Sequence, residues 1–149
     1  MHLSAIIVGA WSLSAAALAA QAHPDVPAVD ETITLYATAW NEPDASARRR
    51  LLERSWSESG TYTDPTAHVE GRAALDKHIE AFLKTQPAGT RIVPASAIDA
   101  HHGRFRFAWK MLLPDGSVAI EGMDYGELDA DGRISRIVGF FGPLAVRNP

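Results

Sequence analysis

A strict two-residue alternation over residues 104–111 constrains the fold more than any other feature of this sequence. Large apolar side chains alternate there with Arg, Ala and Lys, and they are Phe105, Phe107, Trp109 and Met111. This period of two is typical of a strand in a sheet with one buried face. Turn signals at 114–116 (Pro-Asp-Gly) and 129–132 lead into strand-like segments at 118–128 and 134–141. We therefore predict a meander of antiparallel strands in the C-terminal half.

The preceding part of the chain has the period of a helix. Apolar residues follow at i, i+3, i+4 and i+7 from Ile33 to Trp40, which predicts an amphipathic helix that ends before Pro43. A second helix is expected from Asp44 or Ser46 through residues 51–52 toward Trp56, where Ser-Gly at 59–60 breaks the pattern. A third is expected between residues 71 and 86. We expect a short strand over residues 61–63 and a loop around His68, and weaker strand signals cover 91–97 and 97–101.

Three helices followed by strands predict an α+β fold, with the helices on one face of a curved antiparallel sheet. A sheet of this kind encloses a cone-shaped cavity against its helices. The 149 residues are enough for one domain with a substantial core.

The first 22 residues differ in composition from the rest of the chain. No charged side chain occurs over 3–22, and Ala-Gln-Ala at 20–22 places small residues where a signal peptidase reads them. We predict a cleaved leader over 1–22, a mature domain over 23–149 without a stable membrane span, and a secreted or periplasmic location. The alternatives are an uncleaved anchor, or a start codon assigned too far upstream, which would make the protein cytoplasmic.

Composition excludes several classes of function. The chain has no Cys, so disulfides, thiolate metal sites and cysteine nucleophiles are ruled out. Its net charge of -4 argues against a nucleic-acid partner. The basic run 48–50 stands among acidic residues and is interpreted as a solvated helix face. No phosphate-binding loop, dinucleotide fingerprint or nucleophile elbow occurs, and no cofactor is predicted.

Asp124 is the strongest candidate for a functional residue. Strict alternation places it on the apolar face of its strand, while Glu121 and Glu127 mark the wetter face. An unpaired ionised carboxylate is costly in apolar surroundings. Asp124 is therefore neutral, paired with Arg104 or Arg106, or part of a pocket wall.

Two further residues complete the candidate catalytic set. Asp64 precedes a proline, so it either fastens a turn through a local backbone bond or faces a cavity whose apolar walls raise its pKa. Tyr36 belongs to the first helix stripe, as a core residue or as a hydrogen-bond donor. A metal site built from Asp64, His68, His78 and Asp124 lacks any recognised ligand spacing, and no metal is predicted.

Aromatic side chains would fill or line the same interior. His78 lies on the apolar face of its helix, so it is either a core residue or a residue that lines the cavity. A wall of flat apolar surface suits a small apolar ligand, including a polycyclic one. The predicted substrate-binding residues are Trp40, Trp56, His78, Phe82, Phe107 and Trp109.

The order of these residues resembles the superfamily of nuclear transport factor 2, the SnoaL-like polyketide cyclases and the Δ5-3-ketosteroid isomerases. The resemblance covers residues 30–143. Tyr36 falls where the isomerases have an oxyanion-donor tyrosine, and Asp64 falls where they have the aspartate base before a proline. Asp124 falls where they have a second oxyanion acid and where the cyclases have a general base. Residues 139–142 (Gly-Phe-Phe-Gly) resemble the closing strand.

The resemblance implies proton transfer next to a carbonyl, with Asp64 or Asp124 as the base and Tyr36 with the other acid at the enolate oxygen. A non-catalytic secreted ligand-binding module and a hydratase or epoxide hydrolase remain alternatives on the same fold. The resemblance also implies a homodimer, formed through the exposed sheet face that carries Arg106, Lys110 and Tyr125.

Overall fold

The computed structural model describes residues 29–145 and 147. The leader predicted over 1–22 and the first residues of the mature domain lie outside the described residues. Helices and strands follow in the order α1 (Val29–Ala39), α2 (Ala45–Ser55), β1 (Trp56–Asp64), β2 (Ala67–Glu70), α3 (Arg72–Thr85), β3 (Arg91–Pro94), β4 (Asp99–His101), β5 (Arg104–Leu112), β6 (Val118–Leu128) and β7 (Ile134–Phe141). Among the described residues, no helix has the length and apolar character that a membrane crossing requires.

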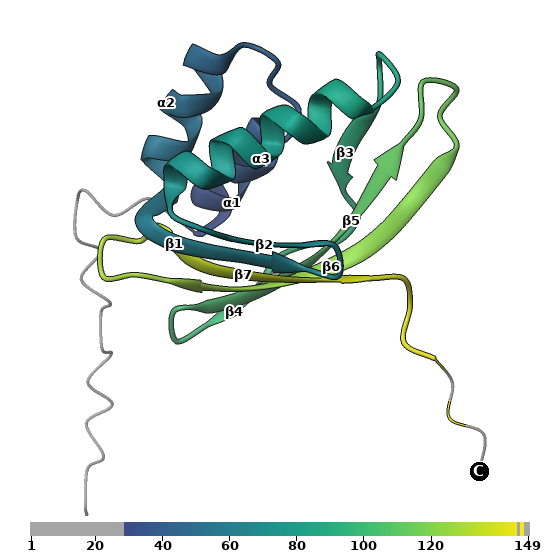
Figure 1. The fold of residues 1–149 in the computed structure, drawn as a ribbon. Coiled ribbons are helices and arrows are strands. Elements are labelled where there is room, and N and C mark those ends of the chain that lie inside the picture. The colour runs from purple at the N-terminus through teal and green to yellow at the C-terminus, as the bar shows by residue number, and fades with distance from the viewer. Residues whose placement is uncertain (1–28, 146, 148–149) are drawn as a thin grey trace, which may run out of the picture.

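The fold is α+β, with the three helices packed on one face of a curved sheet, as predicted (Figure 1). Six strands follow the order β2-β1-β7-β6-β5-β3, and β4 pairs with β5, so the sheet does not close into a barrel. The meander of β5, β6 and β7 is antiparallel and turns at the two predicted turn sequences. The core lies between the sheet and the helices and includes Ile33, Leu52, Leu75, Ile79, Ile134 and Ile137.

The sheet is mixed, where a wholly antiparallel one was expected. Strands β1 and β7 run parallel to each other. The chain reaches β7 from β1 only after α3 and five other strands, so no hairpin forces the pair to be antiparallel. A pairing between strands this far apart in the sequence leaves no local signal.

Strand β1 begins at Trp56, which was expected at the end of the second helix. The strand also runs through Gly60, where the sequence predicted only a break after the second helix. A β-carbon at Gly60 would lie 2.6 Å from Nε1 of Trp56, so the glycine makes room for the buried indole instead. His68 lies in β2, a strand the sequence did not reveal. The helices begin close to where they were predicted, and Asp44 caps α2 by accepting from the Ala47 amide at 2.7 Å.

The basic run 48–50 is only partly a solvated face, which corrects the interpretation from the sequence. Arg48 on α2 is 1% exposed, and its Nε donates to Asp76 Oδ1 on α3 at 2.6 Å. Arg49 and Arg50 are exposed. The partner of Arg48 lies on the next helix, so this ion pair was not visible in the local pattern.

Candidate active site

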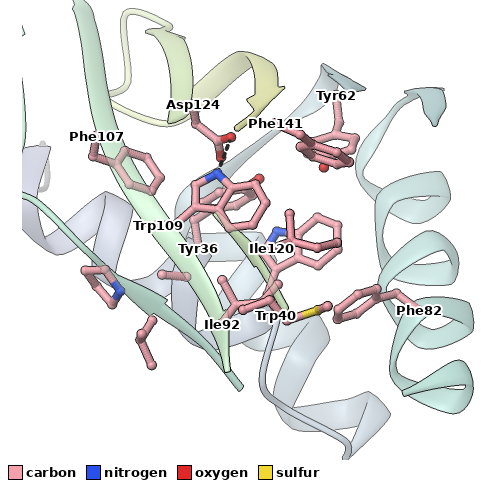
Figure 2. A pocket seen from close by; sticks show the side chains of 14 residues that line it. Tyr36, Trp40, Tyr62, Phe82, Ile92, Phe107, Trp109, Ile120, Asp124 and Phe141 are labelled. Atoms are coloured by element: carbon pink, nitrogen blue, oxygen red, sulfur yellow. Dashed lines mark hydrogen bonds between the residues drawn. The ribbon is translucent and has the colours of Figure 1, made fainter. Parts of the chain in front are cut away.

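A small cavity lies between the concave face of the sheet and helices α1 and α3. Its volume is about 80 Å³, and most of its wall is aromatic or aliphatic. Figure 2 shows the side chains that line it: Tyr36, Ala37, Trp40, Tyr62, Phe82, Ile92, Val93, Pro94, Phe107, Trp109, Met111, Ile120, Asp124 and Phe141. Two of the three predicted catalytic residues, Tyr36 and Asp124, belong to this wall.

Asp124 is placed in the cavity wall by strand alternation and by glycines. Its neighbours on the same face of β6 are Gly122 and Gly126, and it lies opposite Gly139 of β7 in the strand register. A β-carbon at Gly139 would be 3.0 Å from Asp124 Oδ1. The missing side chains therefore make room for a carboxyl group on an otherwise apolar face.

From the residues that the structure describes, the Asp124 carboxyl group accepts one hydrogen bond, from Nε1 of Trp109 to Oδ1 at 2.8 Å (Figure 2). Trp109 lies on β5 directly opposite Gly122. A β-carbon at Gly122 would be 2.6 Å from Cζ2 of Trp109, so only a glycine lets the indole lie across the sheet. The glycine on one strand thus positions the hydrogen-bond donor on the next.

Burial dominates the electrostatics of Asp124. The side chain is 6% exposed, and burial raises the pKa of its carboxyl group to about 7, with the Trp109 hydrogen bond opposing and the Asp64 charge adding to the rise. Among residues 29–145, no Arg, Lys or His forms an ion pair with it. The expected alternative of an ion pair with Arg104 or Arg106 is therefore wrong, and Arg106 pairs instead with Asp99 at 2.9 Å. Asp124 can therefore hold or release a proton near neutral pH.

Tyr36 projects from α1 into the same cavity. Its ring is 2% exposed, stacks on Trp56 at 5.5 Å between ring centroids, and meets Trp40 edge-on at 6.4 Å. Burial and the negative charge of Asp124 raise the pKa of the Tyr36 phenol well above 10.0. The hydroxyl group therefore stays protonated and can serve as a hydrogen-bond donor.

Asp64 has the geometry of a turn residue. Its Oδ1 accepts from the Thr66 amide at 2.6 Å, the Thr66 hydroxyl at 2.8 Å and the Ala67 amide at 2.8 Å, and its Oδ2 accepts from the Tyr62 hydroxyl at 2.7 Å. Partial burial alone would raise the pKa of Asp64, but these hydrogen bonds outweigh it and the pKa falls below 3.8. Asp64 is absent from the cavity wall. It is close to Asp124 all the same, because a β-carbon at Gly139 would also be 3.5 Å from Cβ of Asp64.

The predicted substrate-binding residues divide into two groups. Trp40, Phe82, Phe107 and Trp109 line the cavity. Trp56 is fully buried behind Tyr36, and His78 packs on the rings of Trp40 and Tyr62, with centroids 5.8 and 5.6 Å apart. In the described part of the chain, no three His, Cys, Asp or Glu side chains gather in a possible metal cluster.

Tyr62 is the polar cavity residue that the sequence did not single out. It is 6% exposed and stands two residues before Asp64 on β1, so strand alternation places both on one face. That spacing is visible in the sequence, but the strand predicted over residues 61–63 ends before Asp64, so it does not relate the two side chains. Residues 92–94 of β3 and Phe141 also line the cavity.

Comparison with known proteins agrees with this architecture. The SnoaL-like domain family matches residues 33–137. A proposed isomerase of the SnoaL-like family from Agrobacterium tumefaciens is 37% identical, with 75% of this chain and 95% of that chain covered and a TM-score of 0.71. No curated protein is significantly similar in sequence.

More distant structures show the same fold. A protein of unknown function with a cystatin-like fold from Methylobium petroleophilum has a TM-score of 0.64 at 20% identity, with 82% of each chain covered. A proposed polyketide cyclase from Sinorhizobium meliloti has a TM-score of 0.57 at 19% identity, with 77% of this chain and 95% of that chain covered. The chain therefore belongs to the SnoaL-like family of the nuclear transport factor 2-like fold.

Proposed function

We propose that this protein binds a small apolar carbonyl compound in the cavity and transfers a proton at the carbon next to the carbonyl. The observation that carries the proposal is the Asp124 carboxyl group, which is buried in an apolar wall and has no cationic partner among residues 29–145. Its pKa of about 7 suits a group that must both take and return a proton near neutral pH. The 37% identical relative, a proposed isomerase, supports the same class of reaction.

The chemistry divides between two side chains. Ionised Asp124 takes a proton from the carbon next to the carbonyl, and the C–H electron pair becomes the carbon–carbon double bond of an enolate. The carbonyl π electrons move to oxygen, where the Tyr36 hydroxyl donates a hydrogen bond to the developing charge. Asp124 then returns the proton to the same carbon or to one conjugated with it, which restores the carboxylate and completes an isomerase-type cycle.

Asp124 is favoured over Asp64 as the base. Asp64 uses both carboxylate oxygens in hydrogen bonds, Oδ1 within its own turn and Oδ2 to the Tyr62 hydroxyl. Its pKa is lowered and it is absent from the cavity wall, so it is a weak base that does not face the ligand. Within the described part of the chain, Asp124 accepts a single hydrogen bond, from Trp109 to Oδ1, which leaves Oδ2 for a proton.

The size of the cavity supports a small ligand. Its volume of about 80 Å³ is below the roughly 150 Å³ of an engineered cavity that holds benzene. A monocyclic ketone would need modest movement of the rim, where Phe82 is half-buried and Phe141 is 37% exposed. A polycyclic ligand would need the sheet and helices to separate much further.

Proton–deuterium exchange into small cyclic enones, followed by NMR, tests the proposal. We expect Asp124→Asn to slow exchange by about 10²- to 10⁴-fold and Tyr36→Phe by about 10²-fold, the usual effects of losing a base or an oxyanion donor. Exchange by the unmodified protein should rise with pH and reach half of its maximum near pH 7, as Asp124 ionises.

Glu121→Gln is the matched control, because Glu121 is an exposed acid on the opposite face of the same strand. Equal exchange in the Asp124→Asn variant and in this control would refute the mechanism. Enone binding without any exchange would instead support a non-catalytic ligand-binding module.

We further propose a homodimer through the outer face of the sheet. Met123 and Phe140 are 37% and 54% exposed there, beside the Lys110–Glu121 pair. Light scattering after size-exclusion chromatography should give twice the chain mass, and Phe140→Asp should reduce it to the mass of one chain. A single-chain mass for the unmodified protein would refute this assembly.

We propose cleavage after Ala22 and export of residues 23–149. Expression of the full chain followed by cell fractionation and N-terminal sequencing should find mature protein that begins at His23 outside the cytoplasm. An intact N-terminus in the cytoplasmic fraction would contradict both statements.

A further inference from the structure

Tyr62 brings to the cavity a polar group that the proposed proton transfer does not use. Its ring forms part of the wall from β1 (Figure 2). The ring is held between Trp40, with centroids 5.3 Å apart, and His78, with centroids 5.6 Å apart. These contacts leave the phenol ring little freedom, so only its hydroxyl hydrogen can reorient.

Asp64 determines the direction in which the Tyr62 hydroxyl hydrogen points. The Oδ1 atom of Asp64 is occupied by three donors from Thr66 and Ala67, which fixes the carboxylate in the turn between β1 and β2. The Oδ2 atom lies 2.7 Å from the Tyr62 hydroxyl oxygen. An ionised carboxylate can only accept, so Tyr62 must be the donor in this bond.

A phenol that has given its hydrogen to one partner offers only lone pairs to a second. We infer that Asp64 is a positioning residue that makes Tyr62 a hydrogen-bond acceptor for a hydroxyl group of the ligand, which is therefore a small hydroxy ketone. The inference rests on the proposed function, since it assumes that a carbonyl ligand occupies the cavity.

The two tyrosines then have opposite hydrogen-bonding roles toward the ligand, one as donor and one as acceptor. Tyr36 has no such carboxylate partner among the described hydrogen bonds and keeps its hydrogen for the carbonyl oxygen, while Tyr62 receives a hydrogen from the ligand. Desolvated polar groups discriminate strongly against ligands that leave them unpaired. A ligand with a carbonyl at both ends would place an acceptor against an acceptor at Tyr62.

Three matched ligands separate these cases: cyclohexanone, 4-hydroxycyclohexanone and cyclohexane-1,4-dione. Their dissociation constants are measured by calorimetry on the full chain. We expect the unmodified protein to bind the hydroxy ketone at least about tenfold more tightly than the dione, which corresponds to one hydrogen bond of about 1.4 kcal/mol. Tyr62→Phe should abolish this preference, because it keeps the ring and removes the acceptor.

Asp64→Asn makes the sharpest test. The amide nitrogen of Asn can donate to the Tyr62 oxygen, which frees the Tyr62 hydrogen to point toward the ligand. We expect the preference to reverse, with the dione bound more tightly than the hydroxy ketone. Thr66→Val is the control, since it removes one hydrogen bond to Asp64 and leaves the Tyr62 contact in place. It should keep the original preference.

The possible results distinguish the two proposals. Equal binding of hydroxy ketone and dione by the unmodified protein, or an unchanged preference in both Tyr62→Phe and Asp64→Asn, would overturn this inference and leave the proposed proton transfer standing. Absence of binding for all three ligands would overturn both. Circular dichroism shows whether each variant is folded, and Tyr62→Phe keeps the test decisive if Asp64→Asn does not fold.

Discussion

At the scale of single residues, Asp124 and Asp64 demonstrate how environment separates two identical side chains. Asp124 accepts one hydrogen bond in an apolar wall, and its pKa rises to about 7. Asp64 accepts four hydrogen bonds at a half-buried turn, and its pKa falls. The number of donors, together with the depth of burial, determines which of the two can exchange a proton near neutral pH.

The raised pKa of Asp124 predicts a specific dependence of stability on pH. The unfolded chain releases this proton near pH 3.8, whereas the folded chain holds it until about pH 7. Between these values the folded state binds one more proton, so the free energy of unfolding should fall by about 1.4 kcal/mol per pH unit as pH rises, and level off above pH 7. Asp124→Asn should remove this pH-dependent loss of stability, so the variant should be more stable than the unmodified protein at pH 8.

Urea unfolding from pH 4 to pH 8 measures this effect as the difference between the unmodified protein and the variant. Glu121→Gln serves again as the control for loss of an exposed carboxylate. Parallel curves for the unmodified protein and Asp124→Asn would show that Asp124 does not hold its proton in the folded state.

At the scale of elements, β5 and β6 build the site together by placing aromatic rings opposite glycines. Phe105 lies opposite Gly126 and Trp109 lies opposite Gly122, with Asp124 between the two glycines. Each ring occupies the space that a side chain on the facing strand would fill. The alternation visible in the sequence predicted which residues share this face, but not that the rings cover the glycines.

Gly122→Ala and Gly126→Ala form a matched pair at this scale. Each new methyl group collides with a ring, so both variants should lose about 1–3 kcal/mol of stability. Only Gly122→Ala displaces the indole that donates to Asp124, so only this variant should raise the pKa of Asp124 further.

The pH profile of deuterium exchange reports that pKa in both variants. We expect the midpoint to move to higher pH in Gly122→Ala and to stay in place in Gly126→Ala. A common shift in both would mean that general loosening of the sheet, and not the Trp109 contact, controls Asp124.

At the scale of the whole molecule, a buried ion pair connects helices α2 and α3. Arg48 of α2 and Asp76 of α3 are 1% and 9% exposed, and the Arg48 guanidinium also donates to the Glu42 carbonyl at 3.0 Å. Helix α3 carries Phe82 of the cavity wall and His78 behind Tyr62. The ion pair therefore helps to position one side of the cavity from a distance.

Removing one partner of this pair should be strongly destabilising. We expect Arg48→Ala to cost about 3–5 kcal/mol, because it leaves the buried Asp76 carboxylate with only the exposed Arg49, at 3.8 Å, as a cationic partner. Arg50→Ala, at an exposed position of the same run, should cost less than about 0.5 kcal/mol. Thermal and urea unfolding of the two variants measure the difference, and equal losses would contradict the role of the pair.

The sequence by itself determined the local features of this protein. Helix periods, the alternation over 104–111 and two turn signals depend on residues a few positions apart, and they correctly predicted three helices, the C-terminal meander and the buried face that holds Asp124. The order of Tyr36, Asp64 and Asp124 was sufficient for the family resemblance.

Only the tertiary structure decided what depends on distant segments meeting. The parallel pairing of β1 with β7, the Arg48–Asp76 pair and the Trp109–Asp124 bond each join residues that no local pattern relates. The same holds for the difference between Asp64 and Asp124. Both are aspartates in or beside strands, and the pKa of each follows from how many donors and how much apolar surface the folded chain brings to its carboxyl group.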